Sequence, residues 1–170
     1  MSDVYRGDNK IKPVLPAHKK AYPWGLLIDF SKYGNAHSYM TSGFAAAEEM
    51  LTWTDGKNVV LDLTVEQPET DIRMTLRCFP FISGQKVALQ EIHVYVNHHR
   101  LSFLEVFSSD FAMEDVIFDI PRELIPSVRL NLQFFLPLAA SPFELGSGDD
   151  LRRLGLAIES LCLAPRLAYS

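Results

Sequence analysis

The stretch of the sequence richest in chemical groups is GFAAAEEMLTWTDG, at residues 43–56. Glu48 and Glu49 stand a few residues before Trp53 and Asp55. Carboxylates accept hydrogen bonds from hydroxyl groups, and the flat indole ring stacks on the C–H face of a pyranose. The interpretation we favour is structural: Trp53 covers the core while Asp55 begins the turn into the next strand. The functional alternative is that these residues form the rim of a glycan-binding site.

Side chains elsewhere extend this candidate rim. His37 and Tyr39 lie shortly before the stretch, and they either line the same rim or are exposed loop side chains. Near the C-terminus, Asp150 and Arg152 follow two glycines, and the planar guanidinium of Arg152 matches a carboxylate. We expect Arg152 to brace the fold or, alternatively, to contact a ligand. The candidate ligand-binding residues are therefore Trp53, Glu48, Glu49, Asp55, His37, Tyr39 and Arg152, and the candidate structural brace is Asp150, Arg152 and Asp55.

Glu48 and Asp55 have two further candidate roles. Either carboxylate is a candidate partner for Arg152 in the brace. The pair also suggests a glycosidase, whose two carboxyl groups lie ~5–9.5 Å apart, although most acidic pairs in a loop meet that distance. A sugar-active enzyme is therefore the last of the functions considered, and no catalytic residue is predicted.

The remaining reactive side chains indicate no metal or cofactor. The five histidines lack the i,i+4 spacing of a helical metal site, and the chain has no glycine-rich phosphate loop and no nucleophile elbow. Cys78 and Cys162 lie in apolar stretches without the spacing of zinc ligands. We expect two reduced, buried thiols.

Charge and composition exclude several classes of partner. The 170-residue chain has a net charge of −5, which argues against nucleic acid because phosphate binding requires a basic face. No apolar run approaches the roughly 20 residues that span a bilayer, and the N-terminus lacks the apolar centre of a signal peptide, so a cytoplasmic location is expected. Residues 1–22 are basic and contain two prolines. They predict a flexible N-terminal arm, followed by a single domain over 23–170.

The elements that must position these side chains are predicted to be strands. The segment 71–78 alternates apolar and polar residues, which is the period of a half-buried strand. Similar patterns predict strands at 26–30, 59–65, 71–78, 91–97, 98–107, 115–121, 128–136 and 154–163. About eight short antiparallel strands with few helices predict an all-β fold, an antiparallel β-sandwich of jelly-roll type.

Three local features refine this prediction. Asn97 and His98 are expected to turn a hairpin, because asparagine tolerates the left-handed backbone of such turns. The alternation changes phase near Glu159, which predicts a bulge in the last strand. Helical turns are predicted only at 45–50 and 123–125, and their short length keeps them local.

Three stretches of the sequence together resemble a known group of domains. They are FSKYGNAHSYMTSGFAAAEEMLTWTDG, VYVNHHRL and SPFELGSGDDLRRLGLAIESLCL. With these motifs the chain resembles the β-sandwich accessory domains of bacterial surface-polysaccharide machinery, which are similar to carbohydrate-binding modules and often appended to glycosyltransferases. The resemblance covers about residues 24–165. It implies a non-catalytic accessory module of polysaccharide synthesis or modification, which binds glycan or docks onto a glycosyltransferase.

The chain departs from these motifs where sugar stacking would be expected. Phe44 stands where the pattern has tryptophan, and Met50 and Leu51 replace a Trp-Gly pair. These residues suit a protein interface or a core better than a sugar. The segment LQFFLPL, at 132–138, is apolar on both strand faces. The alternative function is therefore a protein-interaction or homo-oligomerisation domain without sugar binding.

Overall fold

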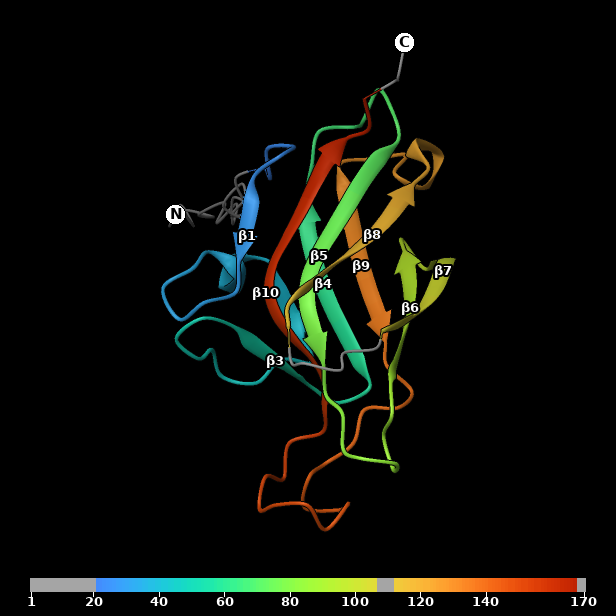
Figure 1. The fold of residues 1–170 in the computed structure, drawn as a ribbon. Coiled ribbons are helices and arrows are strands. Elements are labelled where there is room, and N and C mark those ends of the chain that lie inside the picture. The colour runs from blue at the N-terminus through green and yellow to red at the C-terminus, as the bar shows by residue number, and fades with distance from the viewer. Residues whose placement is uncertain (1–20, 107–111, 168–170) are drawn as a thin grey trace, which may run out of the picture.

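The computed structural model describes residues 21–106 and 112–167, and this part of the chain forms ten strands and two short 3₁₀ helices (Figure 1). The strands are β1 (Leu27–Asp29), β2 (Met40–Ser42), β3 (Thr52–Asp55), β4 (Asn58–Thr64), β5 (Ile72–Pro80), β6 (Gln90–Val96), β7 (His99–Val106), β8 (Glu114–Ile120), β9 (Arg129–Phe135) and β10 (Leu154–Pro165). The 3₁₀ helices are η1 (Ala36–Ser38) and η2 (Arg122–Leu124). Within the described residues, no helix is long and apolar enough to cross a membrane.

The strands form two sheets whose order is that of a jelly roll. The first sheet runs β1-β10-β5-β8, with β3 also paired to β10, and the second runs β2-β4-β9-β6-β7. All strand pairings are antiparallel. From β3 to β10 the chain passes repeatedly between the sheets, so that the orders 3-10-5-8 and 4-9-6-7 face each other. The predicted all-β jelly-roll sandwich is confirmed.

The core lies between the two sheets and follows the predicted alternation. In β5, Ile72, Met74, Leu76 and Cys78 are fully buried, while the residues between them face outward. From the second sheet, Leu132 and Phe134 of β9 belong to the same core. Cys78 and Cys162 are both free, Cys78 buried and Cys162 half-buried.

The hairpin turn and the bulge are confirmed. Asn97 and His98 connect β6 to β7 with φ angles of 46° and 68°, the left-handed conformation on which the prediction rests. The pairing of β10 with β5 shifts register between Ile158 and Ser160, on either side of Glu159. The 3₁₀ helix η2 confirms the turn predicted near 123–125.

The prediction for residues 45–55 is partly wrong. Residues 45–50 form no helix, because the backbone N–H groups of Ala45 and Glu48 donate to Trp53 and Leu51 instead of to a helical turn. Trp53 itself lies in β3, which pairs with β10, and the turn predicted at Asp55 and Gly56 follows it, with Gly56 at a φ of 108°. Two short strands, β2 and β3, were not predicted, because three or four residues are too few to show a strand period. The equally short β1 lies within the predicted strand 26–30.

The predicted N-terminal arm falls almost wholly outside the described residues, since residues 1–20 are not described. Tyr22, at the end of that predicted segment, is buried in the core. Its backbone bridges Val65 in a parallel pairing, and the N–H of Leu163 donates to its hydroxyl at 3.1 Å. Burial raises the pKa of the Tyr22 phenol well above its usual range.

Candidate functional site

Arg152 lies between two of the predicted carboxylates. Its guanidinium Nη2 is 2.7 Å from Asp150 Oδ2, and its Nη1 is 3.5 Å from Glu48 Oε1. The backbone N–H of Arg152 also donates to Asp150 at 2.9 Å. These hydrogen bonds from Arg152 lower the pKa of the Asp150 carboxyl. Arg152 thus links the start of β10 to the loop before β3.

Asp55 contributes to the same junction in a different way. Its Oδ1 accepts a hydrogen bond of 2.9 Å from the backbone N–H of Arg153, and it makes no hydrogen bond or ion pair with the Arg152 side chain. The hydroxyl of neighbouring Thr54 accepts from the N–H groups of Gly155 and Leu156. The WTDG motif and the DLRRLG motif therefore meet at the β3–β10 pairing, where each satisfies backbone groups of the other.

Trp53 projects from the solvent side of the first sheet. Its indole packs edge-to-face on Phe79, with ring centroids 5.3 Å apart, and on Phe81 at 6.4 Å. Ala157 of β10 pairs with both Trp53 and Phe79 and is fully buried, so the two larger rings cover it. The contacts of Trp53 are those of a residue covering a sheet.

Several of the other predicted binding residues contact groups other than Trp53. His37 is exposed in η1, with its ring nitrogen 3.2 Å from the Gly34 carbonyl. Tyr39 packs edge-to-face on Tyr22 at 5.7 Å, and exposed Glu49 pairs with Lys32 at 3.3 Å. Of the seven candidate ligand-binding residues, all of them described, Glu48 and Arg152 are the one ion-paired couple.

A second surface, which the sequence did not single out, brings polar and aromatic groups together. It is the outer face of the second sheet, formed by alternate side chains of β4, β9, β6 and β7. We call this surface the outer face; its members are Asn58, Val60, Asp62, Thr64, Arg129, Asn131, Gln133, Phe135, Glu91, His93, Tyr95, Arg100, Phe103 and Glu105.

An aromatic row crosses one end of the outer face. His93 of β6 is the cross-strand partner of both Phe103 on β7 and Phe135 on β9. The imidazole stacks on Phe103 with centroids 5.4 Å apart and planes at 19°, and tilts against Phe135 at 5.8 Å. Glu91 Oε2 lies 3.1 Å from His93 Nε2 and orients the ring. Phe103 remains 50% exposed, so the row offers an apolar ring to solvent.

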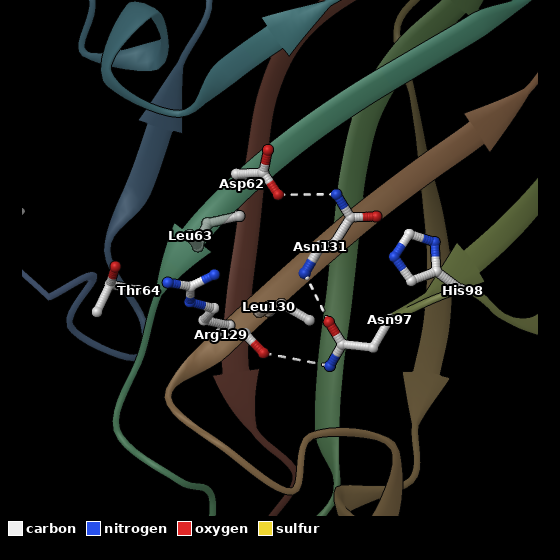
Figure 2. Close-up of a pocket in the computed structure, with 8 residues that line it drawn as sticks. All are labelled: Asp62, Leu63, Thr64, Asn97, His98, Arg129, Leu130 and Asn131. Carbon is white, nitrogen blue, oxygen red and sulfur yellow. Dashed lines mark hydrogen bonds between the residues drawn. The ribbon is translucent and has the colours of Figure 1, made fainter.

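A polar hollow occupies the other end of the outer face (Figure 2). Its volume is about 470 Å³, within the size range of small-molecule sites. It is lined by Asp62, Leu63, Thr64, Asn97, His98, Arg129, Leu130 and Asn131. Asp62 accepts hydrogen bonds from the Asn131 amide at 2.7 Å and from the Thr41 hydroxyl at 2.8 Å. These two bonds hold the carboxylate in place at the rim.

Asn97 fixes the shape of the hollow. Its side-chain oxygen accepts from the Asn131 backbone N–H at 2.8 Å. Its amide nitrogen donates to the carbonyls of Leu124 at 2.8 Å and Arg129 at 3.2 Å. The β6–β7 turn is therefore hydrogen-bonded to β9 beyond Val96 and Leu132, the last residues of β6 and β9 that pair with each other. The dashed lines in Figure 2 show the bonds between Asn97 and both Asn131 and Arg129. Asn97 is a positioning residue, since its polar atoms are used within the fold.

Several groups in the hollow remain available to a ligand. Among the described residues, the Thr64 hydroxyl, the His98 ring and the Arg129 guanidinium have no hydrogen-bond partner. The carboxylate of Asp62 and the side-chain oxygen of Asn131 can accept further hydrogen bonds. The hollow thus offers both donors and acceptors on the same sheet face as an aromatic row, which is an arrangement for binding a polyhydroxylated molecule.

Comparison with known proteins gives structural likeness only. No family model matches the chain, and no curated protein matches it. Among solved structures it is similar to the CBM36-1 domain of a multidomain xylanase from the hindgut metagenome of Trinervitermes trinervoides, with 9% identity and a TM-score of 0.48 over 84% of this chain and 98% of that one.

Two other solved structures have the same degree of likeness. A family 35 carbohydrate-binding module from an environmental isolate is 16% identical, with a TM-score of 0.45 over 86% of this chain and 90% of that one. The module CBM36 in complex with calcium and xylotriose is 6% identical, with a TM-score of 0.44 over 74% and 88%. These values assign neither a family nor a ligand to this chain.

Proposed function

We propose that the chain is a non-catalytic glycan-binding module whose site is the outer face of the second sheet. The observation that carries this proposal is the presence of the aromatic row and the polar hollow on one continuous sheet surface. The backbone pairings from β7 through β6 and β9 to β4 fix the relative positions of both parts. A rigid sheet holds such groups without the ordering cost that a loop site would carry.

The two ends of the outer face suit the two kinds of surface that a sugar presents. Pyranose rings have apolar C–H faces, which pack on aromatic rings such as Phe103, and equatorial hydroxyls, which both donate and accept. Asp62 and Asn131 accept from hydroxyls, and Thr64 can donate to them. Tyr95 and Gln133, a cross-strand pair, lie between the two ends. A glycan of two or more residues would therefore contact both.

Binding to a glycan panel, measured with wild type and three single variants, tests this proposal. Phe103→Ala and Asn131→Ala should each weaken binding by about ten-fold or more, equivalent to about 1.4 kcal/mol. Trp53→Ala, on the other sheet, should leave the affinity unchanged. Loss of binding in Trp53→Ala alone would instead place the site at the rim predicted from the sequence. No binding of any glycan at millimolar concentration would overturn the proposal.

We further propose that this module serves a glycosyltransferase of bacterial polysaccharide synthesis. The resemblance of the WTDG and DLRRLG motifs to accessory domains of that machinery supports the proposal. Its test is co-purification of the chain with a glycosyltransferase of bacterial surface-polysaccharide synthesis, with the outer-face variant Phe103→Ala as a control. Failure of the two proteins to associate would leave a glycan as the sole proposed partner.

A second candidate function, docking to a protein, is favoured by the outer surface of the first sheet. Leu27, Cys162, Thr75 and Ile117 form one cross-strand row there. Leu27 at its one end is 54% exposed and Ile117 at the other is 50% exposed. Light scattering tests self-association through this row: an Ile117→Lys variant should dissociate any dimer, and a monomeric wild type would remove homo-oligomerisation from consideration.

A further inference from the structure

The geometry points to an acidic sugar as the ligand of the polar hollow, with the sugar carboxylate paired to Arg129. This inference rests on the proposed glycan-binding function and names the chemical class of the glycan. It starts from the distribution of charge pairs over the described residues, and it concerns only the end of the outer face shown in Figure 2.

Arginines in the described part of the chain are, with two exceptions, paired to carboxylates. The paired ones are Arg73, Arg77, Arg122, Arg152, Arg153 and Arg166. The two without a carboxylate partner among the described residues are Arg100 and Arg129, and both belong to the outer face. In a chain of net charge −5, the two described arginines without a carboxylate partner are thus both on the surface proposed to bind glycan.

Arg129 is the one of these two that lines the hollow. It begins β9 opposite Thr64 of β4, and Figure 2 shows its side chain extending toward Thr64. Its backbone carbonyl accepts from Asn97, so the start of β9 is held in place while the guanidinium stays available. A guanidinium offers a planar set of donors that matches a carboxylate with two parallel hydrogen bonds.

The hollow also separates the cation from its acceptors. Arg129 and Thr64 form one cross-strand pair. Asn131 and Asp62 form the pair two residues further along the strands, and this spacing separates the two pairs by roughly 7 Å. A hexuronic acid carries its carboxylate on one side of the ring and hydroxyls on the other. With the carboxylate at Arg129, those hydroxyls reach Asp62 and Asn131. Asp62 would repel an anion placed at its own end, so the arrangement also fixes the orientation of the sugar.

Titration of the wild-type chain with three probes tests the inference directly. Glucuronate, glucose and glucose 6-phosphate share one ring and differ only at carbon 6. Amide chemical-shift changes of His98, Asn131 and Thr64 report binding in the hollow. We expect shifts with glucuronate at millimolar concentration and about ten-fold weaker binding of glucose. Preferential binding of glucose 6-phosphate would overturn the carboxylate assignment in favour of a phosphate.

Two charge-matched variants and a polymeric ligand complete the test. Arg129→Gln should weaken binding of oligogalacturonate by about ten-fold or more, since it removes the charged donors. Lys57→Gln removes one positive charge from the exposed turn between β3 and β4, outside the outer face, and should change the affinity by less than about three-fold. Equal effects of the two variants would indicate general electrostatic attraction and would overturn a specific contact at Arg129.

Failure of this inference is distinguishable from failure of the proposed function. Acidic oligosaccharides that bind wild type and Arg129→Gln equally, but lose affinity in Phe103→Ala, would overturn the carboxylate contact at Arg129 and leave the glycan site in place. Absence of binding by every neutral and acidic glycan would overturn both. Circular dichroism of each variant establishes that an altered affinity does not come from unfolding.

Discussion

Asn97 shows how one side chain both ends a hairpin and builds a candidate site. Its φ of 46° suits asparagine better than most residues, and its amide makes three hydrogen bonds to the backbone of other segments. Replacing Asn97 with Ala leaves the N–H of Asn131 and the carbonyl of Leu124 without these partners. We expect Asn97→Ala to lower the free energy of unfolding by about 1–3 kcal/mol in urea denaturation.

Two further variants separate the hydrogen bonds of Asn97 from its backbone conformation. Asn97→Gly keeps the left-handed turn and loses the hydrogen bonds, so it should destabilise the fold less than Asn97→Ala but still measurably. Asn58→Ala, which removes one exposed hydrogen bond with Gln133 on the same sheet, should change stability by no more than about 0.5 kcal/mol. An Asn97→Ala protein as stable as wild type would contradict the positioning role.

At the scale of elements, the junction of β3 with β10 depends on Gly155, which has no side chain. A Cβ added to Gly155 would lie 2.7 Å from Leu136 Cδ1 and 3.1 Å from the Thr54 hydroxyl, both of which are buried. Gly155→Ala should therefore destabilise the fold by about 1–3 kcal/mol through overpacking. Thermal unfolding measures this effect, and Gly148→Ala is the control because its added Cβ meets nothing closer than 3.7 Å.

A Leu136→Val change offers a second check on the same junction. If overpacking against Leu136 is the cause, the smaller side chain should recover part of the stability lost in Gly155→Ala, so that the two changes are not additive. Additive losses would show that the glycine is required for another reason.

Strand by strand, the sequence predicted the elements that bury one face along their length. Segments such as 72–78 and 129–135 alternate clearly, because their inner side chains share one core. The alternation also identifies the outward positions of each strand. It does not show which strands are neighbours in the sheet. The outer face depends on that pairing, because Asp62, Asn131 and His93 come from three strands that are far apart in sequence but adjacent in the sheet. The predicted rim shows the converse limit, because residues near in sequence, such as Glu49 and Trp53, make their contacts with different groups.

At the scale of the whole molecule, the two sheets present different surfaces to a partner. On the first sheet, ion pairs occupy much of the surface: Arg77 contacts Asp115 and Glu159, and Arg73 contacts Asp119. On the second sheet, the polar groups surround a hollow and leave a guanidinium available. One core joins the two sheets, so a ligand bound to the second sheet stabilises the fold as a whole.

The single core predicts that one buried thiol will report global unfolding. Cys78 lies in β5, between β10 and β8, and is fully buried. Burial raises the pKa of its thiol to about 12, so the reactive thiolate is scarce in the folded protein. In a Cys162→Ser variant, the rate of reaction of Cys78 with DTNB should follow the population of the unfolded state. The urea dependence of that rate should then give the same free energy of unfolding as circular dichroism.

The wild-type protein supplies the internal control for this measurement. Its second thiol, Cys162, is half-buried on the outer surface of the first sheet and should react in a separate, faster phase with little dependence on urea. A Cys78 rate that is insensitive to urea would mean that β8 opens locally from β5 while the rest of the sandwich stays folded. The free energy of this local opening would then be separate from that of global unfolding, and ligand binding at the second sheet would not protect Cys78.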